Sequence, residues 1–322
     1  MDNLSAVLAE HQARDAFVLH CEMDAAWSVQ IADRATVGMV VMLRGYCVLH
    51  LDGRAPVVLG AGDVAVVKGP TPYVLSDQPD RPFSVVVQPG QVCRAVAGHE
   101  AAAAEMTLGT RSWGNSRNGS CAFLAVAYEL PGQIRGRLLP AVPELVVVQS
   151  APAGVGDGPT SPEDPLLELL AAEMVHARPG QDAMVDRLVD LVLISTIRRW
   201  FSAPGATPPR WWSAQEDPVV GQVLALMHHH PGQPWSLDAL AERVGYSRAT
   251  VARRFCETVG KPPMSYLADW RLALAADLLR GTDRSVEAIA HAVGYRNAFA
   301  FSSAFKRQHG SSPRAFRLGE AA

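Results

Sequence analysis

Cysteine is scarce in this chain and is scattered along it. The 322 residues contain five cysteines, an odd number, and no two of them stand in a Cys-x-x-Cys spacing. Disulfide frameworks need paired cysteines and zinc fingers need closely spaced ones, so both are excluded. We therefore expect buried, reduced thiols at Cys21, Cys47, Cys93, Cys121 and Cys256.

Long apolar runs are also missing. No stretch reaches the ~18 consecutive apolar residues that a membrane-spanning helix requires, so no membrane partner is expected. The amino terminus lacks the apolar core of a signal peptide. Charged residues make up only 19% of the chain, but the hydrophobic content of 48% excludes a disordered chain. The sequence predicts a cytoplasmic globular protein of about two domains.

Charge is unevenly distributed between the two parts of the chain. Residues 1–217 contain 16 Lys and Arg against 24 Asp and Glu, a net charge of −8. Residues 218–322 contain 13 against 8, a net charge of +5. A basic segment behind an acidic body is typical of a DNA-binding module attached to a domain with a different task.

A short motif occurs twice in the basic part. Ser236–Tyr246 (SLDALAERVGY) and Ser285–Tyr295 (SVEAIAHAVGY) are 49 residues apart. Each copy begins with a serine suited to cap a helix, continues with apolar residues at helical spacing, and ends with a glycine that permits a sharp turn. An amphipathic segment with basic residues follows each copy. The repeat predicts two helix-turn-helix units, at about 236–258 and 285–309, and double-stranded DNA as the partner.

The two predicted units are not identical. The glycines that end them, Gly260 and Gly310, are 50 residues apart rather than 49. The second recognition helix, or the turn before it, therefore contains one additional residue near Arg296–Ala300. The helical segment Met264–Arg280 connects the units rigidly and is expected to hold two recognition helices about one turn of DNA, ~34 Å, apart. We expect the two helices to contact different bases.

The acidic part of the chain has a β-rich pattern. Between Phe17 and about Gln88, short apolar runs alternate with turns rich in Gly, Asp and Pro, which is typical of an antiparallel sandwich or barrel. Two amphipathic helices follow, at Asp164–Ala177 and Asp182–Phe201. The predicted domains are a β-rich domain at 1–150, a helical pair at 163–202 after a Gly- and Pro-rich linker at 151–162, a second linker at 203–217 and a DNA-binding domain at 218–318.

Residues 235–317 resemble the DNA-binding domain of the AraC/XylS family of transcription regulators. The resemblance includes LAERVGYS, RRF, IAHAVGY, FKR and the helix Arg271–Leu279. Residues 1–200 are similar to the cupin-like sensor domain of one branch of that family, through LRGYCVLHLDG, GAGDVAVV and Arg111–Asn115. The resemblance implies an α+β multidomain protein, in which a cupin-like β-barrel with a helical pair precedes an all-α domain of two helix-turn-helix units.

The function implied is sequence-specific regulation of transcription, as activator or repressor, under the control of a small-molecule effector bound in the barrel. No enzymatic activity and no cofactor are expected, and RNA polymerase is a further candidate partner. The second helix of the pair has an apolar stripe, which is expected either to pack on the barrel or to form a homodimer: Leu188, Leu191, Val192, Ile194, Ser195 and Ile197.

Candidate DNA contacts are the exposed positions of the two recognition helices. Arg forms bidentate contacts with guanine, whereas basic residues far along the helix are assigned to phosphates. Relatives commonly have Arg at the position of Ser303 and larger polar residues at Ala249 and Ala252, so a relative's operator does not transfer to this chain. The candidates are Arg248, Thr250, Arg253 and Arg254 in the first helix, and Arg296, Asn297, Phe299, Ser302, Ser303, Lys306 and Arg307 in the second.

A mostly apolar pocket in the barrel is the expected effector site. Its candidate lining residues are Trp27, Met39, Val41, Leu43, Tyr46, Val48, Val66 and Tyr73.

A cupin metal site is not expected. No His-x-His precedes a Glu in the β-rich region, and Tyr73 stands where the family has a ligand histidine. Cys47 and His50 point to opposite faces of their strand. The run His228–His230 is explained by solvation and by its position at a helix carboxyl end rather than by metal binding. Two alternatives remain: a cupin-like metalloenzyme domain tethered to DNA, and a thiol-responsive regulator that acts through Cys47 or Cys93.

Overall fold

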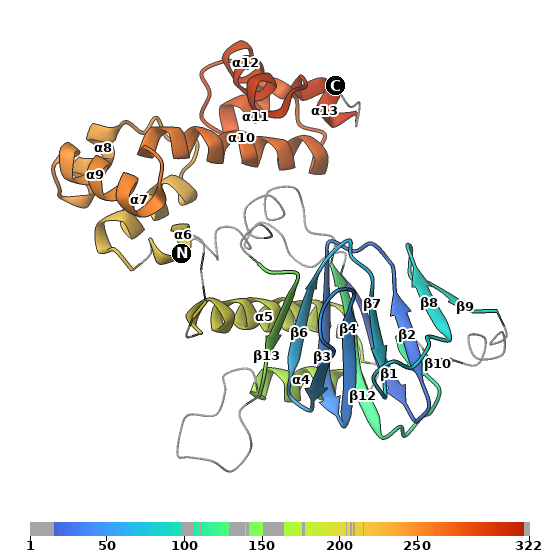
Figure 1. Ribbon diagram of the computed structural model, residues 1–322. Coiled ribbons are helices and arrows are strands. Elements are labelled where there is room, and N and C mark those ends of the chain that lie inside the picture. The colour runs from blue at the N-terminus through green and yellow to red at the C-terminus, as the bar shows by residue number, and fades with distance from the viewer. Residues whose placement is uncertain are drawn as a thin grey trace. The chain divides into compact units, whose positions relative to one another are not determined.

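The computed structural model describes residues 16–97, 106–109, 111–128, 139, 142–150, 164–175, 178–203, 205–206, 208, 210–214 and 216–318. The chain divides into a β-rich unit that ends at Ala206 and a helical unit that follows it (Figure 1). This confirms the predicted fold class. The linker predicted at 151–162 lies outside the described residues. Within them, no helix is long and apolar enough to cross a membrane.

The β-rich unit contains two β-sheets. The seven-stranded sheet has the order β10-β11-β1-β12-β3-β6-β13, and the six-stranded sheet has the order β5-β4-β7-β2-β8-β9. Most neighbouring strands are antiparallel, but β1 with β11 and β2 with β8 are parallel. The strands are β1 Phe17–Met23, β2 Ser28–Ile31, β3 Val37–Arg44, β4 Tyr46–Leu51, β5 Val57–Gly60, β6 Val64–Lys68, β7 Tyr73–Ser76, β8 Val85–Gln88, β9 Val92–Ala95, β10 Thr107–Gly109, β11 Ser112–Gly114, β12 Cys121–Tyr128 and β13 Leu145–Val148.

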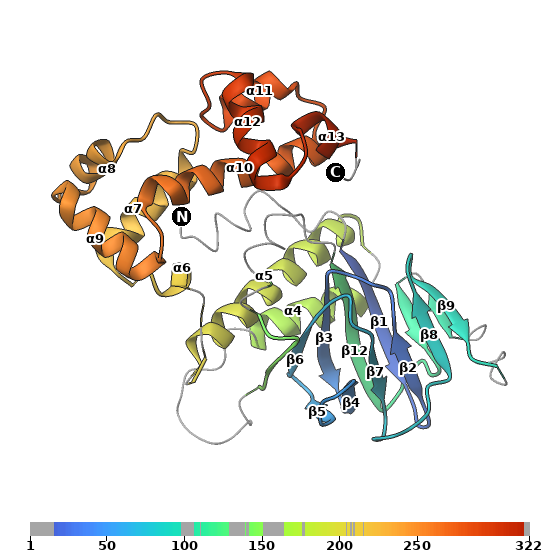
Figure 2. The same ribbon diagram turned by 45° about the horizontal axis from the view of Figure 1, so that its top comes forward.

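The seven-stranded sheet is covered on both faces. Val40 and Met42 of β3 belong to the core between the sheets, where Trp27 stacks on Phe123 with ring centroids 5.6 Å apart. The alternate residues of β3 point the other way, toward helices α4 (Asp164–Val175) and α5 (Gln181–Ser202), which lie against this sheet (Figure 2). Strands buried on both faces are apolar at nearly every position, as β3 is.

The helical unit contains two helix-turn-helix units joined by one long helix (Figure 2). The long helix, α10, contributes Tyr266 and Leu267 to the core of the first unit and contacts α11, α12 and α13 in the second. Its 19 residues span about 28 Å at the usual rise of an α-helix. The helices are α6 Arg210–Ser213, α7 Pro218–His229, α8 Leu237–Val244, α9 Arg248–Val259, α10 Pro263–Gly281, α11 Val286–Ala292, α12 Ala298–His309 and α13 Pro313–Arg317.

The additional residue of the second unit lies in its turn and not in its recognition helix. Helices α9 and α12 both have 12 residues. Their N-cap residues, Ser247 and Asn297, are 50 positions apart, whereas the motifs before them are 49 apart. Arg296 therefore precedes the helix cap. Of the two predicted locations, the recognition helix and its entry, the structure shows the entry, and the contact of Arg296 with DNA stays a prediction.

Candidate DNA interface and barrel cavity

Recognition helix α9 is anchored by one apolar face. Val251 and Phe255 are buried against α8 and α10, in a core that includes Leu240 and Leu267. The opposite face carries Arg253, whose side chain is 65% exposed and lies 3.1 Å from Glu257. Arg248, at the start of the helix, is similarly exposed and lies 3.5 Å from Asp238. Exposed ion pairs contribute little stability, so both guanidinium groups can exchange these partners for DNA.

Two predicted contacts of α9 have partners inside the unit. Arg254 Nε lies 3.2 Å from Asp217 Oδ2, and this side chain is only 35% exposed. The Thr250 hydroxyl lies 2.8 Å from Ser247 Oγ, within the helix cap. Both side chains are less exposed than those of Arg248 and Arg253, and their DNA contacts stay predictions.

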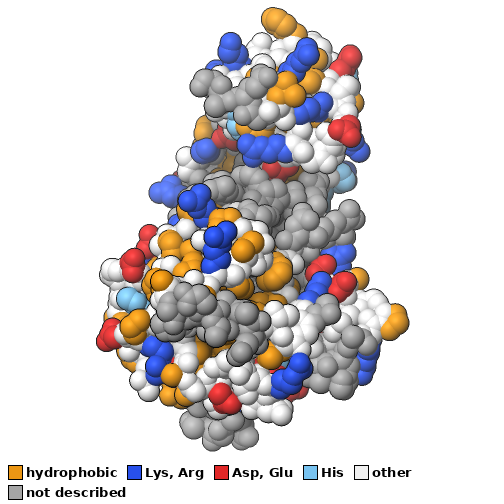
Figure 3. Space-filling view, turned by 90° about the vertical axis from the view of Figure 1, so that its right-hand side faces the viewer, with side chains coloured by type: hydrophobic (Ala, Val, Ile, Leu, Met, Phe, Trp, Pro, Cys, Tyr) orange, Lys and Arg blue, Asp and Glu red, His pale blue; other side chains and the backbone are white. Residues whose placement is uncertain are grey.

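Recognition helix α12 is anchored by Phe301 and Phe305, which are both fully buried. Phe299 is 84% exposed, and Ser303, Lys306 and Arg307 are exposed as well, whereas Ser302 is half-buried. Asn297 uses its side chain to accept a hydrogen bond from the Ala300 N–H at 2.8 Å, so its main role is to cap the helix. Lys and Arg side chains are visible over the helical unit at the top of Figure 3. The exposed basic residues of α12 lie toward its carboxyl end.

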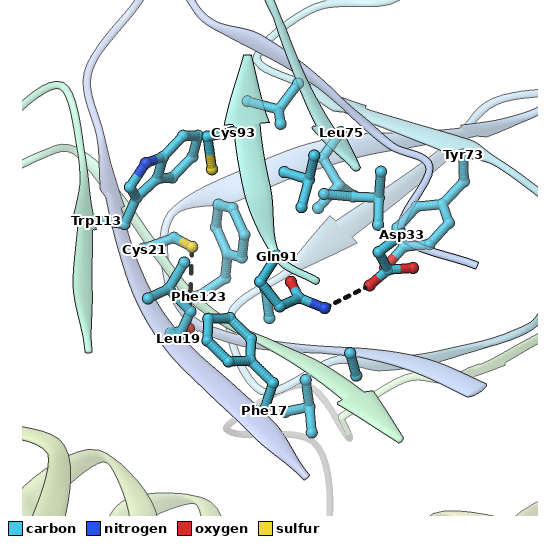
Figure 4. A pocket seen from close by; sticks show the side chains of 16 residues that line it. Phe17, Leu19, Cys21, Asp33, Tyr73, Leu75, Gln91, Cys93, Trp113 and Phe123 are labelled. Atoms are coloured by element: carbon cyan, nitrogen blue, oxygen red, sulfur yellow. Dashed lines mark hydrogen bonds between the residues drawn. The ribbon is translucent and has the colours of Figure 1, made fainter. Parts of the chain in front are cut away.

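The β-rich unit contains a cavity that lies among β1, β2, β7 and β12 (Figure 4). It encloses about 550 Å³ of empty space, its open mouth included. Apolar side chains such as Phe17, Leu19 and Phe123 form most of the wall. The polar side chains of the wall include Asp33, Gln91 and Tyr73, and Gln91 Nε2 donates a hydrogen bond to Asp33 Oδ2 at 3.0 Å. Trp113 of β11, from the segment Arg111–Asn115 that resembles the cupin-like sensor domain, also lines the cavity.

Of the eight predicted pocket residues, only Tyr73 lines this cavity. Trp27 lies in the core between the sheets. Tyr46 is 56% exposed, and Leu43 is half-buried near the end of β3. The remaining four alternate with core residues along their strands and point away from the space between the sheets: Met39, Val41, Val48 and Val66.

The wall residues that the sequence did not reveal come mainly from β1 and β12. Examples are Phe17, Leu19 and Cys21 of β1, with Phe123 and Ala125 of β12. Strand β12 is apolar along its whole length, so its hydrophobicity does not distinguish one face from the other. In β1, however, His20 and Glu22 alternate with Leu19 and Cys21, and this alternation is a sequence signal for the wall face.

Cys21, Cys47 and Cys121 are buried, as predicted, and Cys93 is half-buried, whereas Cys256 is exposed, so the prediction of its burial is wrong. The four thiols of the β-rich unit are poor nucleophiles. Burial raises the pKa of Cys21, Cys47 and Cys93, and it raises the pKa of Cys121 to about 11. A raised pKa lowers the fraction of reactive thiolate at neutral pH. Cys21 and Cys93 line the cavity together, whereas Cys47 lies in the core against Met42.

The histidine run at the end of α7 is divided. His228 is buried, and its Nε2 lies 2.9 Å from the Tyr266 hydroxyl. The centroid of its ring lies 4.3 Å from that of the Trp270 ring. The prediction that solvation accounts for the whole run is therefore wrong for His228, which packs in the core, while His229 and His230 are exposed. In the described part of the chain, no group of three or more His, Cys, Asp or Glu side chains is arranged to hold a metal ion.

Both units of the chain match known protein families. A family model described as Cupin matches residues 2–202, and one described as Helix-turn-helix domain matches residues 240–319. The HTH-type transcriptional regulator AlkR of Acinetobacter baylyi is 27% identical over 320 residues, which cover 98% of this chain and 99% of AlkR. A putative AraC-like transcription regulator of Streptomyces lividans is 29% identical over 321 residues, 98% of each chain. The crystal structure of an AraC-type transcriptional regulator from Chromobacterium violaceum is 31% identical, covers 34% of this chain and 96% of that one, and superposes with a TM-score of 0.32.

Proposed function

This chain belongs to the AraC family of helix-turn-helix transcription regulators that carry an amino-terminal cupin domain, and on that premise we propose that a small molecule bound in the barrel cavity controls its binding to DNA. The relatives named above are transcription regulators and not enzymes, and this chain is likewise a DNA-binding regulator.

The cavity supports effector binding. Small-molecule sites are concave, mostly apolar and supplied with a few polar groups that fix the orientation of the ligand. This cavity has an apolar wall and, opposite part of it, the hydrogen-bonded pair of Asp33 and Gln91. The effector that fits best is a compact apolar molecule with one hydrogen-bond donor, which the Asp33 carboxylate accepts.

Control of DNA binding requires that the effector bind more tightly to one functional state of the protein than to the other. The coupling is reciprocal, so DNA must change the affinity for the effector by the same factor. Thiol-responsive control has weaker support, because burial raises the pKa of the cavity thiols Cys21 and Cys93.

The effector site and the DNA-binding helix are separable by two substitutions. We use indole as the probe, because it is apolar and has one N–H donor. Ala125→Leu, which narrows the cavity, is expected to weaken indole binding on the order of ten-fold in calorimetry. It should leave unchanged the affinity for genomic fragments that the purified protein selects when no indole is present.

Arg253→Ala is the reciprocal variant. It is expected to lower the affinity for the selected fragments by about ten-fold or more, because a bidentate guanine contact is lost, and to keep indole binding. Unchanged indole binding in Ala125→Leu, or no saturable binding to the unmodified protein, counts against the cavity as effector site. Unchanged DNA affinity in Arg253→Ala counts against the assignment of Arg253.

We also propose that the protein forms a homodimer through α5. The predicted stripe is divided: Leu188, Val192 and Ile197 are buried in the β-rich unit, whereas Leu191 is 46% exposed. Met184, seven residues earlier on the same face of the helix, is 43% exposed. Large apolar side chains grouped on an exposed helix face are typical of an interface. RNA polymerase is the further partner that we propose for a regulator of this kind.

A further inference from the structure

Helix α12 presents an aromatic ring to solvent where a recognition helix contacts base edges. Phe299 is 84% exposed, more than any other large apolar side chain in the described residues. It is the second residue of α12 and lies in the first turn, which the Asn297 cap fixes. The amino-terminal residues of a recognition helix are the ones that reach base edges in the major groove.

Helix geometry places Phe299 near the centre of the outward face. Residues of an α-helix follow one another at about 100°, so Phe299 and Ser303 each lie about 160° from the buried Phe301, on either side. Ser303 lies farthest from the core formed by Phe301 and Phe305, and Phe299 and Arg307 lie about 40° to either side of it. Lys306 and Arg307 follow about one turn later. The outward face therefore begins with an apolar ring beside a small hydroxyl and becomes basic toward its carboxyl end.

The equivalent positions of α9 have the opposite arrangement. Because the two helices have equal length and caps 50 residues apart, Ala249 corresponds to Phe299 and Arg253 to Ser303. In α9 the large side chain is Arg253, at the later of the two positions, and its guanidinium has five N–H donors. In α12 the large side chain is Phe299, at the earlier position, and its ring has neither donor nor acceptor. The two helices thus differ in the kind of base edge they can recognise.

We propose that Phe299 recognises thymine in the half-site bound by α12, by packing its ring against the C5 methyl group. The inference rests on the binding of α12 in the major groove of DNA. Thymine alone among the four bases presents a methyl group there, and apolar side chains discriminate it by contact. A cytosine or adenine amino group in the same place faces the ring and loses its hydrogen bond to water, which carries a desolvation cost. Ser303 is small enough to leave room for the base beside the ring.

The experiment removes the methyl group and the ring independently. Duplexes are first selected from a random pool with the full-length protein, and the α12 half-site is identified as the half whose base preferences change in Phe299→Ala. Each thymine of that half is then replaced by deoxyuridine, which lacks only the methyl group. The exposure of Phe299 means that its replacement leaves the core intact, which circular dichroism checks.

The loss of affinity on removing the thymine methyl group is expected only when the Phe299 ring is present. One thymine-to-deoxyuridine replacement lowers the affinity of the unmodified protein by about three- to five-fold, the effect of losing one buried methyl group. The same replacement leaves the affinity of Phe299→Ala unchanged. The matched control, Arg253→Ala, binds all duplexes more weakly and keeps the difference between thymine and deoxyuridine.

Three results overturn the proposal. An equal deoxyuridine effect in Phe299→Ala and the unmodified protein assigns the methyl contact to another residue. Loss of affinity in Phe299→Ala that is the same for every sequence makes the ring a wedge between bases. Unchanged DNA binding in Phe299→Ala assigns the ring to a protein partner. Failure of the unmodified protein to select any duplex is a distinct result, because it rejects the DNA-binding function itself.

Discussion

The carboxylate of Asp217 interacts both with the amino-terminal end of α7 and with Arg254 of α9. Its Oδ1 accepts hydrogen bonds from the N–H groups of Val219 at 2.9 Å and Val220 at 3.1 Å, which caps α7. Its Oδ2 pairs with Arg254 of α9 at 3.2 Å. Helix α7 is thereby tied to the recognition helix α9. The partner of Arg254 lies far from it in sequence, and so sequence alone placed this arginine among the DNA contacts.

Asp217→Ala is expected to destabilise the helical unit. Loss of an N-cap side chain costs about 0.5–2 kcal/mol of unfolding free energy, measured by urea denaturation. Asp217→Asn is the matched control, because asparagine caps a helix as well as aspartate but has no charge for Arg254. Equal destabilisation by both substitutions contradicts the capping role and assigns the stability to the ion pair. DNA affinity should change much less than in Arg253→Ala.

At the scale of elements, α9 and α12 are copies of one plan with different outward faces. Arg253 stands in the first where Ser303 stands in the second. Ser303→Arg therefore gives α12 a guanidinium at the position that α9 uses. The expected result is a new preference for guanine in the α12 half-site, of about ten-fold in affinity, seen by repeating the selection from random duplexes.

A gain in affinity that is uniform over all sequences reflects charge alone and contradicts this assignment. Gln308→Arg is the control, because Gln308 is exposed but lies on the side of α12 away from Phe299 and Ser303. It adds the same charge and should leave base preferences unchanged.

The helices were predictable because their signals are local. Serine caps, apolar spacing and terminal glycines place α8, α9 and α11 in the sequence, and the structure confirms them. The position of the additional residue depends on where α12 begins. Asparagine is a favoured N-cap residue and arginine is not, so Asn297 is a local signal for the start of α12, and the structure confirms it.

In strands that are apolar on both faces, hydrophobicity does not show which residues line the cavity. Strand β3 is apolar on both faces because the other sheet covers one face and the helical pair covers the other. The sequence of β3 then does not show which alternate residues face the other sheet and which face the helices. A shift of one position exchanges the two sets completely. The prediction of Met39 and Val41 as pocket residues is wrong for this reason, and the cavity wall comes largely from β1 and β12.

At the scale of the whole molecule, the proposed homodimer predicts that substitutions on the exposed face of α5 halve the mass of the protein in solution. Met184→Glu with Leu191→Glu places two charges on the exposed face of α5, and the protein is expected to sediment as a monomer. Its affinity for a double operator should fall, because the second helical unit no longer binds at high effective concentration. Val58→Glu, at a strand position that is 57% exposed, is the matched control and should leave the mass unchanged. A monomeric unmodified protein rejects the proposal.

Helix α10 is part of the cores of both helix-turn-helix units. The distance and the angle between the two recognition helices are therefore fixed by one piece of secondary structure. One base pair inserted between two half-sites turns the second by roughly 35° around the DNA axis, which a rigid connector cannot follow. A promoter that this protein controls is therefore expected to tolerate a base substitution in either half-site better than a change of one base pair in the spacing between them.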